Sequence, residues 1–255
     1  MSFPLFSLEK RLALITGSGS GIGFALARGL AEHGAEIVIN GRNIGKVEQA
    51  VAALKVEGHE AHGSVFDVTD MRAVEADIER IERDIRPIDI LVNNAGVQFR
   101  APLDEFPDEE FQRLLQTNVA GVFHVGKAVA RKMIPRRRGK IINIASVASE
   151  LARASIAPYG ATKGAVRNLT RGMSADWARH GLQINAIAPG YFRTELNMAL
   201  TSDPEFSAWL EKRTPAGRWG DVKELVGAAV FLASDASSFV NGHTLYVDGG
   251  ISTSL

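Results

Sequence analysis

Tyr159 and Lys163, two residues able to move protons, stand four positions apart in Tyr159-Gly160-Ala161-Thr162-Lys163. On a helix this spacing places both side chains on one face. A free tyrosine has a pKa of about 10, and a neighbouring ammonium favours the phenolate, so we expect Lys163 to lower the pKa of Tyr159. Such a tyrosine can take the proton of an alcohol as hydride leaves its carbon, and can donate a proton in the reverse direction.

Two further polar residues are expected beside this pair. Ser146 follows a strand-like run, thirteen residues before Tyr159, and its hydroxyl can hold and polarise a substrate oxygen. Asn118, in Thr117-Asn118-Val119, can fix a water that joins the lysine to solvent. Each residue alone has an ordinary structural explanation, such as a cap or a chance helical spacing. Their combination predicts four catalytic residues, Asn118, Ser146, Tyr159 and Lys163.

A glycine-rich segment near the start of the chain predicts a dinucleotide site. A strand-like run precedes it and a helical pattern follows it. Glycine allows a sharp turn and a close approach to a pyrophosphate, and the first N–H groups of the helix then face the phosphates. Because the glycines stand in this context, we prefer a cofactor site to a merely structural turn. The expected cofactor-binding residues here are Gly17, Ser18, Gly19, Ser20, Gly21, Ile22 and Gly23.

The end of the second expected strand indicates which dinucleotide binds. An NAD enzyme usually carries an acid there to hold the ribose hydroxyls, but this chain has Asn40-Gly41-Arg42. A guanidinium binds a 2′-phosphate as a fork, so Arg42 predicts NADP (NADPH) as the cofactor, the alternative being a solvated arginine at a helix start. Asp67, followed by Val68, could accept a hydrogen bond from the adenine amino group or cap a turn. Asn94, Ala95 and Gly96 follow the fourth strand, at the sheet edge where ligands bind.

The pattern of the whole chain predicts an α/β fold that positions these residues. Short, continuously apolar runs alternate with amphipathic segments, which is typical of parallel strands covered by helices on both faces. We expect a single doubly wound Rossmann domain over residues 1–255, with a seven-stranded parallel sheet flanked by helices on both faces. The expected strands are 12–16, 36–40, 61–66, 88–92, 140–145, 183–187 and 244–247, and the expected helices are 21–33, 44–57, 70–84, 107–132, 157–180 and 221–233.

Composition restricts the class of partner. The chain has 255 residues, of which 29 are basic and 29 acidic, so no overall field favours nucleic acid. A basic cluster between Arg131 and Lys140 is interpreted as a solvated helix end. There are no cysteines, and the six histidines show no metal-ligand spacing, so we expect no metal. With no secretory signal or integral membrane segment apparent, we expect a cytoplasmic enzyme with a small-molecule substrate.

The segment 191–215 interrupts the regular alternation. After Pro189-Gly190 it carries Phe192, Leu196 and Trp209 before the last helix and strand. We interpret this segment as a substrate lid, with additional core packing as the alternative.

These motifs resemble the short-chain dehydrogenase/reductase family over essentially the whole chain. The resemblance rests on TGxxxGxG at 16–23, NNAG at 93–96, the four catalytic residues and Pro189-Gly190. It implies that Lys163 also binds the nicotinamide ribose, that Thr194 contacts the cofactor, as do Pro189 and Gly190 near the nicotinamide, and that the protein is a homotetramer. The implied interfaces are the long helices near 107–132 and 157–180 and the C-terminal strand.

Within that family the chain is similar to the gluconate 5-dehydrogenases, which interconvert D-gluconate and 5-keto-D-gluconate. Long shared phrases carry this resemblance, among them residues 187–192 and 212–220. Those enzymes tend to have Gln-Arg-Arg where this chain has Gln98-Phe99-Arg100, and often glutamine where it has Ala148. Both changes predict a less polar pocket. Arg100 is a candidate anchor for a substrate carboxylate, with Ser146 and Tyr159 on the reacting oxygen; a surface arginine is the alternative.

Two other functions remain open on the sequence. A 3-oxoacyl-[acyl-carrier-protein] reductase or another ketone reductase would use the same chemistry, and Phe99 and Ala148 would suit it. A non-catalytic dinucleotide sensor is the more remote alternative, because a fold does not fix a function.

Overall fold

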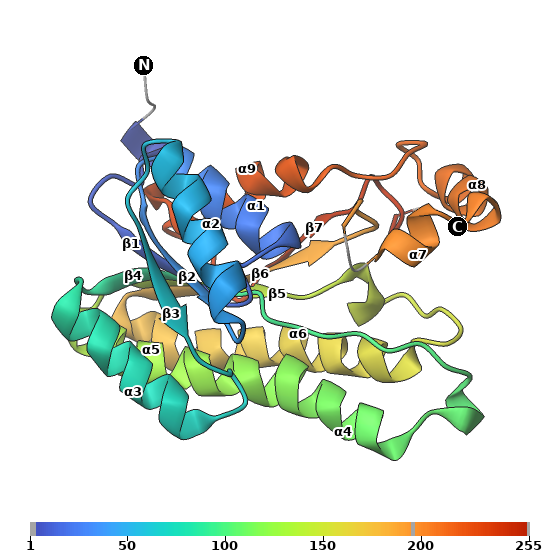
Figure 1. Cartoon of the computed structure of the whole chain (residues 1–255), viewed down its shortest axis with the longest axis horizontal. Coiled ribbons are helices and arrows are strands. Elements are labelled where there is room, and N and C mark those ends of the chain that lie inside the picture. The colour runs from blue at the N-terminus through green and yellow to red at the C-terminus, as the bar shows by residue number, and fades with distance from the viewer. Residues whose placement is uncertain (1–3, 195–196, 254–255) are drawn as a thin grey trace.

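A computed structural model describes residues 4–194 and 197–253 of the chain. Seven strands form one sheet in the order β3-β2-β1-β4-β5-β6-β7, and every neighbouring pair is parallel (Figure 1). This confirms the expected doubly wound sheet. The strands are β1 (Leu12–Ile15), β2 (Glu36–Gly41), β3 (Ala61–Val65), β4 (Ile88–Asn93), β5 (Gly139–Ile144), β6 (Leu182–Pro189) and β7 (Thr244–Val247).

Helices cover both faces of the sheet, as the continuously apolar strands require. On one face lie α1 (Gly21–Glu32), α2 (Ile44–Val56) and α9 (Val226–Ala233), and on the other α3 (Met71–Asp84), α5 (Gly121–Arg136) and α6 (Ala157–Trp177) (Figure 1). The expected last helix begins as a 3₁₀ turn, Val222–Leu225, before α9.

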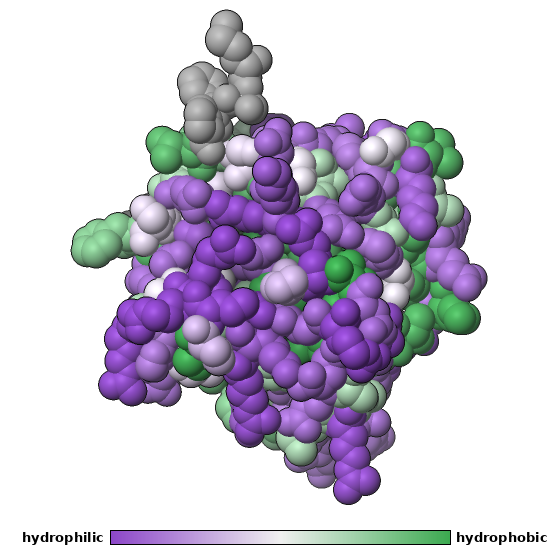
Figure 2. All heavy atoms as spheres, turned by 90° about the vertical axis from the view of Figure 1, so that its left-hand side faces the viewer, coloured by the Kyte–Doolittle hydropathy of each residue, from purple (hydrophilic) through white to green (hydrophobic). Residues whose placement is uncertain are grey.

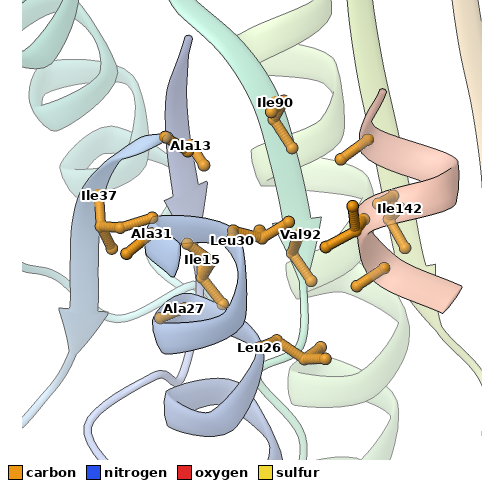
Figure 3. Packing of buried hydrophobic residues seen from close by; sticks show 14 of the residues in the cluster. Ala13, Ile15, Leu26, Ala27, Leu30, Ala31, Ile37, Ile90, Val92 and Ile142 are labelled. Atoms are coloured by element: carbon orange, nitrogen blue, oxygen red, sulfur yellow. The ribbon is translucent and has the colours of Figure 1, made fainter. Parts of the chain in front are cut away.

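The core between the first helix layer and the sheet consists of closely packed aliphatic side chains (Figure 3). Leu26 and Leu30 of α1 lie against Ile15 of β1 and Val92 of β4, and all four are almost completely buried. Each such side chain contributes about 1.5–3 kcal/mol on burial, so this packing fixes α1 firmly on the sheet. The start of α1 is therefore held at the carboxyl ends of the central strands.

α6 carries Tyr159 and Lys163, and its buried stripe explains its orientation. Pro158 occupies the first turn, where its missing N–H costs no helical hydrogen bond. Lys163, Val166 and Thr170 are buried at intervals of three and four residues. This periodicity presses one face of α6 against the sheet and turns Lys163 inward.

The expected single helix 107–132 is interrupted. The structure has α4 (Asp108–Leu115), then a π-helical turn (Gln116–Ala120), then α5. The apolar period persists across the turn, which is why the sequence pattern could not reveal it. Such turns insert a residue into a helix and often occur at functional sites. This one carries Asn118.

The basic cluster at the end of α5 is largely exposed, as expected, but most of its charges are paired. Arg131 and Arg136 of α5 pair with Glu75 and Glu82 of α3 at 3.0 and 2.5 Å, and Lys132 pairs with Glu79. Arg138 pairs with Asp89, and Lys140 is buried. Acidic side chains spaced along α3 lie opposite basic side chains spaced along α5, so the charges of the two helices are paired.

The molecular surface seen in Figure 2 is mostly hydrophilic, with apolar residues scattered over it. Among the helices of the described residues, none has the length and apolar character needed to span a bilayer.

Candidate active site

A cavity of about 440 Å³ opens at the carboxyl ends of the central strands. Strand order reverses between β1 and β4, which is where open α/β sheets bind ligands. The cavity brings together most of the residues that the sequence singled out. Those lining it are Gly17, Ser20, Gly21, Ile22, Gly23, Arg42, Asp67, Val68, Asn94, Ala95, Gly96, Arg100, Ser146, Tyr159, Lys163, Pro189, Gly190 and Thr194.

The glycine loop turns tightly and packs closely against the segment after β4. Gly17 has a φ of +62°, and a Cβ on Gly23 would lie 2.4 Å from Asn94 Nδ2 and 2.5 Å from the Gly17 carbonyl oxygen. Ser20, the N-cap of α1, makes no side-chain cap. The first N–H groups of α1 therefore remain for a ligand, which fits the predicted pyrophosphate site.

Ser18 and Gly19 are not among the residues lining the cavity. The buried Ser18 hydroxyl donates to the Ile15 carbonyl at 2.7 Å and accepts from the Asn40 N–H at 3.1 Å. The Asn40 side chain accepts from the Gly17 N–H and donates to the carbonyl of Phe66. These bonds join the loop to β2 and to the end of β3, so Ser18 and Asn40 hold the loop in shape.

Arg42 and Asp67 lie together at the adenosine end of the cavity. Arg42 Nη1 is 3.4 Å from Asp67 Oδ2, and the Arg42 side chain is 70% exposed. Asp67 Oδ1 accepts from both the N–H and the hydroxyl of Thr69, so the turn interpretation of Asp67 also applies. Burial opposes ionisation, but the Thr69 hydrogen bonds and the Arg42 charge hold the pKa of Asp67 below its usual value. In the protein alone, Arg42 is exposed and paired with Asp67.

The segment after β4 is fastened directly to the glycine loop. The Thr16 hydroxyl accepts from the N–H groups of Asn94 and Ala95, both at 3.0 Å. The Asn94 amide donates to the carbonyls of Thr16 and Gly17, both at 2.9 Å. The two segments are distant in sequence and form one wall of the cavity.

Ser146 and Tyr159 meet at the inner end of the cavity. Ser146 Oγ caps a short turn by accepting from the Ala148 N–H at 3.1 Å, and it also hydrogen-bonds the Tyr159 phenol. The expectation that the pKa of Tyr159 is lowered is wrong for the protein alone. Burial raises it to about 12, and the Ser146 hydrogen bond and the Arg100 charge act in the opposite direction without cancelling that effect. The phenol is therefore protonated at neutral pH.

Lys163 is buried beside Tyr159. Its Nζ donates to the Ile144 carbonyl at 2.7 Å and lies 5.8 Å from the centroid of the Tyr159 ring. Burial lowers the pKa of Lys163 to about 8. The lysine keeps its positive charge at neutral pH, but it holds that charge weakly.

Asn118 is fully buried and does not line the cavity. Its Oδ1 accepts from the Val97 N–H at 2.8 Å, and its Nδ2 donates to the Val97 carbonyl and to the Thr162 hydroxyl. The side chain therefore ties the π-helical turn to α6 and to the segment after β4. A role in holding a water beside Lys163 stays a prediction.

At the outer end of the cavity, Arg100 is half-buried rather than a free surface residue. Its Nη2 donates to Gln98 Oε1 at 3.1 Å and to Asn197 Oδ1 at 3.4 Å. Burial, and then the charge of Arg153, lower the pKa of Arg100. Phe99 does not make the pocket less polar, because its ring packs edge-on against Phe106, 5.5 Å away, and lines no part of the cavity. Ala148 does line it.

Arg153 is a cavity residue that the sequence interpretation missed. Its guanidinium carbon lies 5.1 Å from the ring centroid of Phe206 and 6.0 Å from that of Tyr191. The only sequence signal was its place between Ser146 and Tyr159, on a connection that must pass the reacting groups.

The segment 191–215 folds beyond the carboxyl ends of the strands as α7 (Met198–Thr201) and α8 (Pro204–Arg213) (Figure 1). Leu196 lies outside the described residues. Tyr191, Phe206 and Trp219 form an aromatic cluster, while Tyr191, Thr194 and Asn197 line the cavity. The first residues of the segment thus line the cavity, and its aromatic side chains contribute packing; a lid that covers the substrate stays a prediction.

No group of three or more His, Asp or Glu side chains able to hold a metal occurs in 4–194 and 197–253.

Comparisons with known proteins agree with this geometry. A family model described as enoyl-(acyl carrier protein) reductase matches residues 17–252. The chain is 62% identical, over 100% of both chains, to the gluconate 5-dehydrogenase of Gluconobacter oxydans. It is 55% identical, over 97% of both chains, to the 5-keto-D-gluconate 5-reductase of Escherichia coli. Each comparison covers nearly the whole chain.

A solved structure provides the corresponding comparison in three dimensions. It is a gluconate 5-dehydrogenase from Burkholderia cenocepacia in complex with NADP and tartrate, 60% identical to this chain. The TM-score is 0.97, and the match covers 99% of each chain.

Proposed function

Because the chain belongs to the short-chain dehydrogenase/reductase family, we propose that it is an NADP-dependent oxidoreductase that interconverts D-gluconate and 5-keto-D-gluconate. The observation that carries this proposal is that a single cavity has proton-transfer groups at its inner end and guanidinium groups at its outer end. Ser146, Tyr159 and Lys163 can act on the reacting oxygen, while Arg100 can bind a carboxylate at the other end of the substrate.

The side chains have distinct roles in this reaction. Bound NADP supplies the hydride acceptor, and NADPH the hydride donor. Ser146 holds the substrate oxygen at the site of the proton transfer. Tyr159 is protonated at neutral pH, so it is ready to donate its proton to the oxygen of a ketone. For alcohol oxidation it must first lose that proton, which the positive charges of Lys163 and of oxidised nicotinamide favour.

Several features support NADP as the cofactor. The exposed Arg42 stands where a 2′-phosphate would lie, and neither Asn40 nor Gly41 offers a carboxylate that would repel it. The uncapped start of α1 and the glycine loop suit the pyrophosphate. Lys163 is buried at the inner end, where it can reach the nicotinamide ribose.

The proposal is tested by following NADPH and NADH absorbance with the purified protein and 5-keto-D-gluconate. NADPH oxidation with this acid, and much weaker activity with acetoacetyl thioester and simple ketones, is the expected result. Activity only on the other ketones would support the proposed hydride-transfer reaction but reject D-gluconate and 5-keto-D-gluconate as its substrates. A 3-oxoacyl reductase would be identified by preference for the thioester.

The assembly and the lid belong to the same proposal. A homotetramer would cover Phe111 of α4 and Phe123 of α5, which are 36% and 43% exposed in the single chain. The segment 191–215 would close over bound substrate through α7 and α8. We place the enzyme in the cytoplasm, since a chain with no cysteine gains nothing from an oxidising compartment. Light scattering after size-exclusion chromatography tests the tetramer.

A further inference from the structure

Two guanidinium groups share the outer end of the cavity. Arg100 and Arg153 both line it, and neither forms an ion pair with any residue in 4–194 or 197–253. Their charges oppose each other, since Arg153 helps to lower the pKa of Arg100. Two unpaired positive groups at one end of a half-buried pocket need an anion.

Unused hydrogen-bond donors mark the same place. Arg100 Nε and Arg153 Nη1 are shielded from solvent and have no acceptor among the described residues. A buried donor without a partner is costly, so it usually has an acceptor in the functional complex. A carboxylate has two oxygens that together can accept several such N–H groups.

Two aromatic rings pack against Arg153. It lies over Phe206, which belongs to α8, and over Tyr191, which follows β6. Stacking keeps the planar guanidinium in place without neutralising its charge. An arginine oriented in this way can form a two-pronged contact at a low entropic cost.

We propose that Arg153 binds the substrate carboxylate together with Arg100, and that this pair makes the enzyme selective for sugar acids over neutral polyols. The inference rests on the proposed function and adds to it a second carboxylate-binding residue. Through Phe206 the same residue connects the bound carboxylate to α8.

The test compares two open-chain substrates with NADP⁺. D-glucitol carries a hydroxymethyl group where D-gluconate carries the carboxylate. Arg153→Met should raise the KM for D-gluconate about tenfold or more, as expected for the loss of a charged hydrogen bond. Arg153→Lys keeps the charge but loses the forked pair of N–H donors, so its KM for D-gluconate should lie between those of the wild type and Arg153→Met. Any D-glucitol turnover should stay within about twofold of wild type in both variants.

A binding measurement complements the kinetics and needs no turnover. Calorimetric titration of the NADP-loaded enzyme with tartrate, a hydroxylated dicarboxylate, should show binding that weakens in Arg153→Met. Arg72→Met, the same change at an exposed position on α3, is the control and should bind tartrate as wild type does.

The outcomes separate the two proposals. Unchanged tartrate affinity and D-gluconate KM in Arg153→Met would overturn the carboxylate role. Equal losses with D-gluconate and D-glucitol would also overturn it, because they would show that Arg153 acts by supporting α8. If the wild type oxidises neither substrate but its tartrate binding depends on Arg153, the gluconate assignment fails and the carboxylate site stands.

Discussion

Lys163 Nζ lies 5.8 Å from the centroid of the Tyr159 ring while donating a hydrogen bond to the Ile144 carbonyl. The lysine is thus positioned by the end of β5, and its charge faces the ring of the tyrosine one helical turn before it. Both groups are buried, and burial disfavours the charged form of each, raising the pKa of Tyr159 and lowering that of Lys163. At neutral pH the phenol is therefore uncharged, and the pair carries the single positive charge of Lys163.

Tyr159→Phe removes the proton donor and little else. We expect kcat to fall by about 100- to 10,000-fold, the range for a lost general acid, while NADPH still binds because the cavity keeps its shape. Steady-state kinetics together with fluorescence titration of NADPH would check this. Turnover at the wild-type rate would refute the proton-transfer role of Tyr159.

Lys163→Met should change how stability depends on pH. Folded wild type binds a proton at Lys163 with a pKa of about 8, and the unfolded chain near 10.5. Between these values the unfolded state holds more protons, so the free energy of unfolding of wild type rises with pH relative to the variant, by up to about 3 kcal/mol. Urea unfolding at pH 7, 9 and 10.5 measures the difference. A gap independent of pH would contradict a buried, weakly charged lysine.

Arg42→Ala should weaken NADPH binding selectively. Loss of a charged hydrogen bond to the 2′-phosphate is expected to raise the KM for NADPH about 10- to 100-fold, with the KM for NADH nearly unchanged. The two cofactors are compared at saturating substrate, with Arg72→Ala as a control for the loss of an exposed arginine. Equal changes for NADPH and NADH would argue against contact with the 2′-phosphate.

Gly23→Ala should distort the glycine loop. The added methyl would meet Asn94 and the Gly17 backbone at distances that real Cβ atoms do not adopt, so we expect a loss of about 1–3 kcal/mol in stability and a weakened affinity for NADPH. Gly227→Ala in α9 is the control, because its methyl meets nothing within 4 Å and should stabilise the helix slightly. Thermal unfolding with and without NADPH distinguishes the two; similar melting temperatures would refute the close approach.

Local patterns in the sequence were sufficient to predict the strands of the sheet and many of the residues that line the cavity. The apolar runs predicted all seven strands to within one or two residues at each end. They succeeded best for the central strands, such as β1 and β4, which are buried at every position and carry mainly apolar side chains. The glycine loop and the Tyr159–Lys163 spacing were equally clear, since each is fixed by backbone geometry within one turn.

Features that depend on contacts between distant segments were not predicted. The π-helical turn at Asn118 keeps the apolar pattern of an ordinary helix, and Phe99 turned out to pack against Phe106 instead of lining the pocket. The basic residues of α5 lie at an exposed helix end, but their pairing with acids of α3 depends on a segment distant in sequence.

The sequence by itself determined the fold class, the glycine loop and the spacing that places Tyr159 and Lys163 on one helix face, because propensity, periodicity and short spacing act over a few neighbouring residues. Only the tertiary structure decided that the Tyr159 pKa is raised and that Arg153 joins Arg100, because burial and charge pairing depend on which distant segments pack together.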